Sequence, residues 1–439
     1  MPVRLSSVTL LALLALTTAP RLHAQFGTPP KEVPRPVVPR ILPIDDIRFL
    51  SDDRLAGRLT GSPGADTAAA YLARRFGAVG LQPGAGGWYQ VFTVQRDAPV
   101  AQHAHAAGLS GRNVIGVLPG RDPTLRNEAV IVGAHYDHLG LGGFGSLDPD
   151  STGKVHNGAD DNASGAAMLI EIAARLEAAP PARTVVFIAF SGEELGLLGS
   201  SYYVNHPIYP LSTTLAMINL DMVGRLRQKR LIVYGSRTAR EFPALLDSLN
   251  WHAGLDLRAQ GDGYGPSDQS PFYAAGRPVL HFFTDLHEDY HRTTDDWQKI
   301  NVEGLEQVAD FTTGLVTALA NRAAPLTPVT EPPASPGSGT AAAAGYGAYL
   351  GTVPDMSGNP AGERLPGVRL VGVRAGSPAE RAGLRGDDII TRIGDMNVPD
   401  LQAMTDALRS HQPGDTVAIV IRRGNAVTTL RATLGARGG

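Results

Sequence analysis

Between residues 113 and 321, short apolar runs alternate with longer stretches of helical periodicity. The apolar runs are 113–118, 129–134, 184–190, 214–220, 230–235 and 278–283, and the helical stretches are 163–178, 240–249 and 302–321. Several runs are nearly continuous in Val, Ile, Ala and Phe, which is typical of strands covered on both faces. This alternation predicts an α/β fold, a three-layer sandwich in which helices flank a mostly parallel, mixed central sheet.

The segments on either side of this region divide the chain further. Residues 1–24 have the pattern of a secretory signal peptide, with a positive charge at Arg4, a short apolar core at 8–16 and a cleavage end at Ala24. That core is too short for a permanent transmembrane helix, so we expect an exported protein, periplasmic or extracellular, with no membrane span. The other expected segments are a Pro-rich arm (25–43), a catalytic domain (44–322), a Pro/Ser/Ala linker (323–344) and a small C-terminal domain (345–439).

The composition narrows the possible chemistry. The chain has no cysteine, which excludes disulfides, a cysteine nucleophile and thiolate metal sites. Any metal must therefore be held by His, Asp and Glu. Lys+Arg 39 and Asp+Glu 42 nearly balance, so nothing in the charge indicates a nucleic-acid partner.

Polar residues follow the expected strands where each strand ends. They are His135-Tyr136-Asp137-His138, the stretch from Asn157 to Gly165, Glu193-Glu194, Asp221, and the stretch from His287 to His291. Reacting groups of α/β folds gather at the carboxyl ends of the strands. We therefore expect these side chains to lie together at one edge of the sheet.

Each of these positions has a structural alternative when taken alone. His135 could be a hydrogen-bonded core histidine, and Asp160 or Asp161 could cap the following helix. The two adjacent glutamates could form a solvated loop, Asp221 a turn and His291 a surface residue. Taken together, two histidines and three carboxylates at strand ends predict a site for two metal ions with nitrogen and oxygen ligands.

Such a site suits hydrolysis. Two ions about 3.5–4 Å apart share a bridging carboxylate and lower the pKa of a shared water. A second carboxylate that is not bound to metal accepts the water proton and passes it to the leaving amine. Glu193 and Glu194 can divide the roles of proton carrier and ligand. Asp137, two residues after His135, is placed to orient that imidazole as a hydrogen-bond acceptor.

These motifs resemble the di-zinc aminopeptidase family, which also includes glutamate carboxypeptidase and glutaminyl cyclase. The segments that carry the resemblance are His135-Tyr136-Asp137, Gly158 to Gly165, Glu193-Glu194, Asn219-Leu220-Asp221-Met222 and Tyr290-His291. The segment from Ser267 to Phe272 resembles a further family motif, with Gln269 where His is common.

The resemblance implies a role for each matching residue. His135 and Asp221 would bind one Zn²⁺, and Glu194 and His291 the other. Asp161, which directly precedes Asn162 in the motif, would bridge the two ions. Glu193 would be the general base and acid, acting with a metal-bridging hydroxide, and Tyr290 would stabilise the developing oxyanion.

The C-terminal domain resembles a PDZ domain of the bacterial protease type. The resemblance rests on Tyr349-Leu350-Gly351, on 367–373 and on the block from Ser377 to Ile390. It implies that backbone N–H groups of Tyr349, Leu350 and Gly351 receive the carboxylate of a peptide C-terminus, with residues 401–408 forming the helix along the groove. The alternative is an appendage that binds nothing.

The choice of reaction stays open among relatives of this family. We expect an exported aminopeptidase that acts on peptides with a free N-terminus, because no cluster of arginines accompanies the motifs, although Arg225, Arg227 and Arg292 lie near them in sequence. A carboxypeptidase or another amidohydrolase on the same metals is the first alternative. A PDZ-based binding protein with a vestigial peptidase domain is the second.

Overall fold

The computed structural model describes residues 42–84, 86–94, 106–143, 145–261, 263–329, 348–354, 367–373, 376–399, 403–404, 407–408, 410–424 and 426–435. The predicted signal peptide, most of the Pro-rich arm and most of the linker lie outside these residues. Among the helices that are described, none combines the length and the apolar character that a membrane crossing requires.

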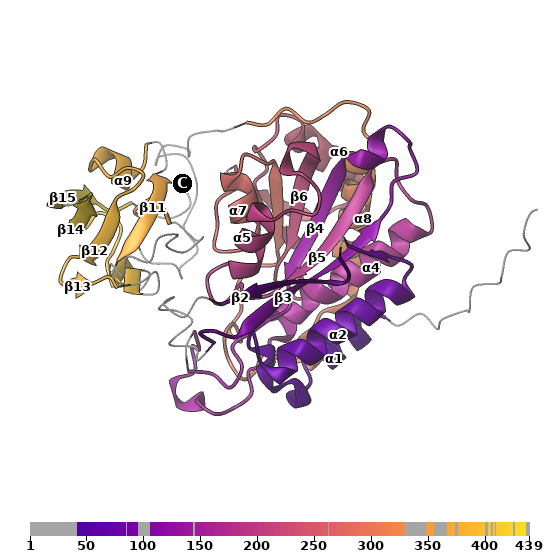
Figure 1. Ribbon diagram of the computed structural model, residues 1–439, viewed down its shortest axis with the longest axis horizontal. Helices are drawn as coiled ribbons and strands as arrows, with labels where there is room; N and C mark the ends of the chain where they lie inside the picture. The colour runs from indigo at the N-terminus through magenta and orange to yellow at the C-terminus, as the bar shows by residue number, and fades with distance from the viewer. Residues whose placement is uncertain are drawn as a thin grey trace, which may run out of the picture. The chain divides into compact units, whose positions relative to one another are not determined.

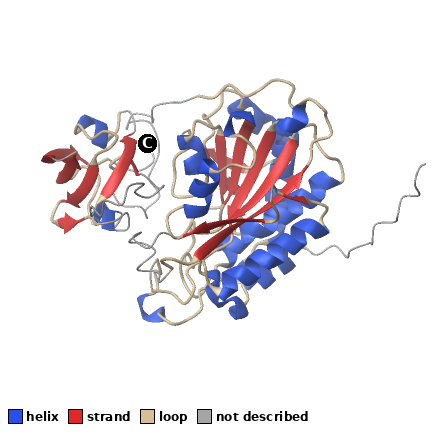
Figure 2. Ribbon diagram, viewed as in Figure 1, coloured by secondary structure: helices blue, strands red, loops and turns tan. Residues whose placement is uncertain are grey.

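The larger domain is built on a mixed nine-stranded sheet (Figures 1 and 2). Its strands are β1 (Gln82–Pro83), β2 (Tyr89–Thr93), β3 (Ser110–Leu118), β4 (Ala129–His135), β5 (Thr184–Phe190), β6 (Thr214–Leu220), β7 (Arg230–Tyr234), β8 (Asp256–Ala259) and β9 (Val279–Phe283). They lie in the order β1-β3-β5-β4-β6-β9-β7-β8, and β2 also pairs with β3. The pairs β5–β4, β4–β6, β6–β9 and β7–β8 are parallel, whereas β3 and β7 join their neighbours β5 and β9 antiparallel. The predicted mixed α/β sheet is confirmed.

Helices cover both faces of this sheet. The α-helices of the domain are α1 (Pro43–Leu50), α2 (Pro63–Ala78), α4 (Gly165–Glu177), α5 (Leu198–Asn205), α6 (Phe242–Ala253), α7 (Gln269–Ala274) and α8 (Val302–Ala320). One layer contains α1, α2, α4, α6 and α8, which pack in a single large hydrophobic core. Tyr203 of α5 and Phe272 of α7 belong to a second core on the other face.

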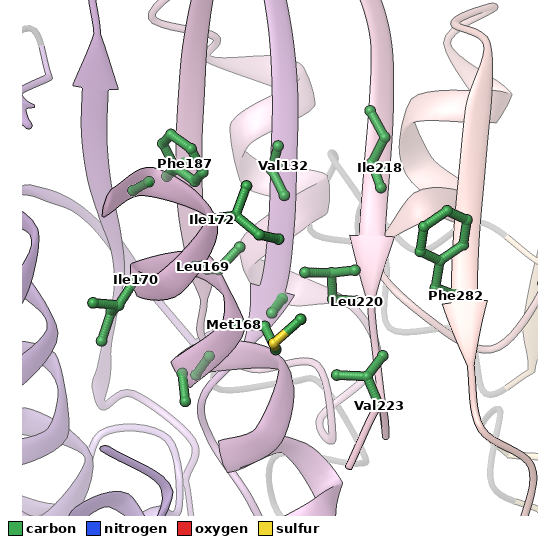
Figure 3. Close-up of a cluster of buried hydrophobic side chains, with 14 of the residues drawn as sticks. Val132, Met168, Leu169, Ile170, Ile172, Phe187, Ile218, Leu220, Val223 and Phe282 are labelled. Carbon is green, nitrogen blue, oxygen red and sulfur yellow. The ribbon is translucent and has the colours of Figure 1, made fainter. Parts of the chain in front are cut away.

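The central strands supply side chains to both cores in alternation, as the pleat of an extended backbone requires. On β5, Val185, Phe187 and Ala189 belong to the large core, whereas Val186, Ile188 and Phe190 belong to the second one. Figure 3 shows the large core where α4 lies over the sheet, with Met168, Leu169 and Ile172 beside Val132, Phe187 and Ile218. Apart from Thr184 and Thr214 at their starts and Asn219 near the end of β6, the strands β4, β5 and β6 are apolar up to their last residues, so the polar side chains that follow them fall at one edge.

Shorter helical turns complete the domain. They are η1 (Asp53–Arg58), η2 (Leu125–Asn127), η3 (Pro149–Ser151), η4 (Ala159–Ser164), η5 (Leu211–Thr213) and η6 (Trp297–Lys299). The first of them ends in an unusual turn, because Ala56, Gly57 and Arg58 all have positive φ angles (47°, 69° and 52°). A Cβ atom on Gly57 would lie 2.2 Å from the carbonyl oxygen of Gly140, so this turn requires glycine there.

The C-terminal part forms a separate, antiparallel sheet with its own hydrophobic core. Its elements are β10 (Thr352–Pro354), β11 (Val368–Val373), α9 (Pro378–Arg381), β12 (Ile389–Ile393), β13 (Met396–Asn397), β14 (Thr416–Arg423) and β15 (Ala426–Thr433). Of the predicted groove helix at 401–408, only residues 403–404 and 407–408 are described, and these are helical. The predicted small β-rich domain is confirmed.

Within this small domain, Asp388 is a buried carboxylate whose charge is matched by Arg423. It accepts hydrogen bonds from Arg423 Nε (2.6 Å) and Nη2 (2.7 Å) and from the N–H of Arg385 (2.9 Å). Burial raises the pKa of Asp388, but these hydrogen bonds outweigh burial, so its pKa lies below the usual value. The stability that Asp388 contributes is therefore present above the pKa of the unfolded chain and is lost as the pH falls through the lower, folded-state pKa.

We expect Asp388→Asn to lower the free energy of unfolding of this domain at pH 7 by about 1.5–3 kcal/mol, the range for hydrogen bonds to charged groups. The difference from wild type should shrink as the pH falls below about 4, where the carboxyl of the unfolded chain becomes protonated, and should be smallest below the lower folded-state pKa. Calorimetric unfolding of the full chain at several pH values measures the loss of stability at pH 7 and its dependence on pH. Asp387→Asn is the matched control, because Asp387 is exposed and has a positive φ of 68° that Asn tolerates. Equal effects of the two substitutions would contradict the argument.

Candidate metal centre

The ends of β4 and β6 bring His135 and Asp221 together. His135 is the last residue of β4, and Asp221 directly follows β6, which runs parallel to β4. The Nε2 atom of His135 lies 3.4 Å from Asp221 Oδ1 and 3.3 Å from Asp161 Oδ1. Glu193 Oε2 lies 4.0 Å from the same nitrogen. These donors form one cluster.

A second cluster lies on the other side of Asp161. The Nε2 atom of His291 is 3.2 Å from Asp161 Oδ2 and 3.3 Å from Glu194 Oε2. The two oxygens of one buried carboxylate therefore face two different imidazoles. This is the arrangement that a bridging ligand between two metal ions requires.

The spacing of the donors fits zinc. Ligands around a tetrahedral zinc ion with bonds of about 2.0–2.1 Å lie about 3.3 Å from one another. The four separations measured between the predicted ligands, 3.3 and 3.4 Å around His135 and 3.2 and 3.3 Å around His291, all agree with this value. The structure thus brings together His135, Asp161, Glu194, Asp221 and His291, the five residues for which the sequence predicts metal binding.

Both imidazoles are oriented by backbone carbonyl groups. His135 Nδ1 lies 3.2 Å from the carbonyl oxygen of Asp137, and His291 Nδ1 lies 2.8 Å from that of Gly145. An Nδ1–H that donates to a carbonyl leaves the Nε2 lone pair free for a metal ion. In both rings it is Nε2 that faces the carboxylates.

Asp137 acts differently from the prediction. We expected its carboxylate to orient His135, but Oδ1 lies 3.8 Å from the imidazole and the backbone carbonyl makes the closer contact. The carboxylate instead accepts hydrogen bonds from Thr60 Oγ1 (2.9 Å) and from the N–H of Glu193 (3.3 Å). Asp137 therefore links the loop after β4 to the backbone that carries Glu193.

The loop that carries Asp161 is fixed by a second buried carboxylate. Asp295 accepts the backbone N–H groups of Asp160 (2.9 Å) and Asp161 (3.0 Å). Asp160 does not cap α4, because its Oδ1 accepts the N–H of Gly224 at 2.7 Å and its Oδ2 lies 3.1 Å from His287 Nε2. Helix capping by Asp160 or Asp161, which was the structural alternative for these two residues, is therefore not what the structure shows.

The segment from Ser267 to Gln269 supports Asp221. Ser267 Oγ donates to Asp221 Oδ2 at 2.7 Å and accepts from the amide of Asn219 at 2.8 Å. The same Asn219 amide lies 3.2 Å from Gln269 Oε1. Gln269 thus takes part in the hydrogen bonds behind the site and leaves the predicted ligands unchanged.

The two adjacent glutamates have opposite pKa shifts. Burial raises the pKa of Glu193 well above its usual range, where the charge of His135 opposes burial and that of Glu194 reinforces it. Burial would also raise the pKa of Glu194, but the charge of His291 and a hydrogen bond from His138 lower it to about 2. Neighbouring groups whose pKa values are pushed apart are suited to different tasks, one to carry a proton and the other to stay ionised.

The pKa values of His135, His291 and Asp161 are also shifted by their neighbours in the site. Burial lowers the pKa of both His135 and His291, but nearby carboxylates outweigh it and raise each pKa well above the usual value. For Asp161, hydrogen bonds from the two imidazoles outweigh burial and hold the pKa well below its usual range. A metal ion would compete with these imidazole protons, because ligands must be deprotonated.

Two further predicted groups have contacts that bear on their roles. The Tyr290 ring stacks on His291, with ring centroids 3.9 Å apart, so it lies beside the second cluster. In the small domain, the N–H of Tyr349 donates to the carbonyl of Gly435 at 2.8 Å, and this corrects the prediction for Tyr349. A peptide carboxylate would have to use Leu350 and Gly351 instead.

Two residues near the site carry no predicted role. His138 is fully buried and its Nδ1 lies 2.8 Å from Glu194 Oε1. Arg58 is also fully buried, and its guanidinium donates to the carbonyl groups of Leu50, Tyr136, Asn157 and Gly158. His138 could have been noticed because it lies three residues after His135. Nothing in the local sequence of Arg58 indicates contacts so far along the chain.

Comparisons with known proteins find similarity in two regions of the chain. Residues 113–316 match peptidase family M28, and residues 348–434 match the PDZ domain. Aminopeptidase YwaD from Bacillus subtilis is 31% identical over 237 residues, which cover 52% of this chain and 48% of that protein. Leupeptin-inactivating enzyme 1 from Streptomyces exfoliatus is 31% identical over 199 residues, 44% of this chain and 40% of that protein. The matches therefore span less than half the length of these two curated relatives.

A solved structure supports the fold. A Zn-dependent exopeptidase from Parabacteroides distasonis superimposes with a TM-score of 0.52 at 19% sequence identity, over 65% of this chain and 100% of that chain. The chain carries a peptidase family M28 domain at residues 113–316 and a PDZ domain at residues 348–434.

Proposed function

We propose that the protein is an exported di-zinc aminopeptidase that removes residues from the N-terminus of peptides. This proposal rests on one observation: the two oxygens of the buried Asp161 carboxylate face the Nε2 atoms of two different histidines, His135 at 3.3 Å and His291 at 3.2 Å. His135 and Asp221 would hold one Zn²⁺, and Glu194 and His291 the other. Bound zinc would supply Lewis acidity, which lowers the pKa of water and polarises the peptide carbonyl.

The chain's own residues would then move the proton. Glu193 is placed beside His135 but farther from it than the ligands, at 4.0 Å, so its carboxylate remains available to water. It takes a proton from the attacking water and delivers it to the nitrogen of the leaving peptide. Its N–H is held by Asp137, which fixes the backbone from which this side chain reaches the substrate. Tyr290 would stabilise the oxyanion.

The contacts of two of the nearby arginines favour an aminopeptidase over a carboxypeptidase. A C-terminal carboxylate requires a free cation near the scissile bond, and arginine is the usual choice. Arg225 is committed to carboxylates of its own protein, at 3.3 Å from Asp289 and 2.9 Å from Asp295. Arg227 is exposed and donates to the carbonyl of Leu286. The relative from Bacillus subtilis is itself described as an aminopeptidase.

The remaining parts of the proposal concern the whole chain. Residues 44–322 would form the peptidase, 323–344 the linker and 345–439 the PDZ domain, preceded by the signal peptide at 1–24 and the arm at 25–43. The PDZ domain would bind the C-terminus of a peptide or protein at Leu350 and Gly351. Gly351 has a positive φ of 85°, and a Cβ there would lie 2.3 Å from Ser377, so this loop conformation depends on glycine.

A comparison of free and N-acetylated peptides tests the reaction. We expect the zinc-loaded protein to release the first residue of Leu-Gly-Gly and to leave N-acetyl-Leu-Gly-Gly intact, because an aminopeptidase recognises the free amine. Release of the C-terminal residue from both peptides would identify a carboxypeptidase instead. No cleavage of either by a protein with two bound ions would refute the proposed activity, and peptide binding by a metal-free protein would favour the vestigial alternative.

A further inference from the structure

His138 is a buried imidazole to which neither the sequence motifs nor the family comparison assigns a task. Its side chain is fully buried, and its backbone N–H donates to the carbonyl of Arg58 at 3.3 Å. A Cβ on Gly158 would lie 2.5 Å from two ring atoms, Cγ and Cδ2. The ring is therefore packed closely against the backbone of Gly158, which leaves it little freedom to turn.

The ring directs one nitrogen at the metal centre. His138 Nδ1 lies 2.8 Å from Glu194 Oε1, whereas its Nε2 is buried with no hydrogen-bond partner among the described residues. The only described partner of this ring is thus one oxygen of one proposed ligand. A buried polar group with this single partner would be costly to keep without a function.

Distances distinguish between a further ligand and a hydrogen-bond donor. Each proposed histidine ligand lies 3.2–3.4 Å from two proposed carboxylate ligands. His138 Nδ1 does not follow this spacing, because it is closer to Glu194 (2.8 Å) and farther from Asp161 (3.9 Å). A separation of 2.8 Å is that of a charge-assisted N–H···O⁻ hydrogen bond.

We infer that His138 is a positioning residue that donates Nδ1–H to Glu194 and keeps this carboxylate bound to zinc through one oxygen. With Oε1 held by His138, only Oε2 faces His291 (3.3 Å). A carboxylate that bound through both oxygens would fill the position that a catalytic zinc site leaves for water. This inference rests on the proposed di-zinc function, since it concerns how one of those ligands is held.

Two substitutions of similar size separate the hydrogen bond from the shape of the side chain. Asn can place its Nδ2 near the position of the imidazole Nδ1 and retain the donor, whereas Leu has the same branching without a donor. In competition with a chromophoric chelator, His138→Leu should bind one of the two Zn²⁺ ions about 10–100-fold more weakly, as is typical when a partner of a metal ligand is lost. His138→Asn should recover most of the affinity, and kcat should follow the same order with little change in KM.

The absorption spectrum of the Co²⁺-substituted protein provides a second readout. We expect the d–d bands of His138→Asn to match those of wild type, since no ligand has been lost. A Co²⁺ spectrum of lower coordination and the loss of one ion in both variants would show that His138 is itself a ligand. Wild-type behaviour of His138→Leu would show that the hydrogen bond has no role. A wild-type protein that binds no metal would refute the proposed function, which is a separate outcome.

Discussion

Replacement of Glu193 by Gln should leave both zinc ions bound and lower kcat by about 10²–10⁴-fold, the usual contribution of a general base. Gln keeps the shape of the side chain but cannot accept the proton. The same substitution at the adjacent residue should act differently, because Glu194 Oε2 lies 3.3 Å from His291 Nε2 among the proposed ligands. Glu194→Gln should therefore weaken binding of one ion. Elemental analysis and turnover of leucine 4-nitroanilide distinguish the two variants.

The control for this pair is Glu288→Gln, which removes an exposed carboxylate three residues before His291. It should change neither the metal content nor kcat. If Glu193→Gln retained most of its turnover, the assignment of the proton carrier would be wrong. If Glu193→Gln lost a metal ion while Glu194→Gln kept both, the two roles would have to be exchanged.

The second large effect is expected at Arg58. Its guanidinium donates to Tyr136 O (2.8 Å), Asn157 O (2.6 Å), Gly158 O (3.0 Å) and Leu50 O, and it is fully buried. Arg58→Met would leave the carbonyl groups of Tyr136, Asn157 and Leu50 without this donor, whereas Gly158 O keeps the N–H of Ala163 at 3.2 Å. At about 1–3 kcal/mol for each unsatisfied group, the total loss approaches the net stability of a whole domain. We expect little soluble protein, or protein whose Tm has fallen far below that of wild type.

Arg54→Met is the matched control on the same turn, because Arg54 is exposed and, among the residues that the structure describes, its side chain pairs only with Asp52. Its Tm should equal that of wild type. Arg58→Lys keeps the charge and part of the donor capacity, so it should fold and show weaker metal binding. A normal Tm and normal metal content in Arg58→Met would contradict the role that we give to this guanidinium.

The central strands could be predicted from sequence because their physics is local. Thr184–Phe190 and Thr214–Leu220 have the predicted bounds, since an unbroken apolar run bounded by polar residues has few other stable environments. The exposed edge strand Asp256–Ala259 was not predicted, because a short polar strand has no such signal. The helix Leu198–Asn205 was missed for a similar reason, as its Gly and Ser residues carry little helical periodicity.

In the site, the proposed ligands could be predicted from the local sequence, whereas their hydrogen-bond partners could not. The five proposed ligands follow strand ends, so the fold class alone suggests that they meet. The hydrogen-bond partners of those ligands depend on loop paths that no motif describes. The carbonyl oxygen of Gly145 contacts His291, which lies 146 residues later in the chain. His135 is contacted by the backbone carbonyl of Asp137 rather than by its carboxylate. The residue type at Asp137 therefore suggested the right neighbour and the wrong atom.

The contacts of Arg58 also have a consequence for the order in which the protein folds. Tyr136 lies 78 residues after Arg58 and Gly158 lies 100 residues after it. Closing loops of this length costs chain entropy before any contact offsets it, and contacts between distant residues slow folding. During synthesis, the guanidinium cannot complete its set of four carbonyl partners until residue 158 has left the ribosome. The loop after His135 and the loop that carries Asp161 should therefore order late, and zinc should bind only after they have done so.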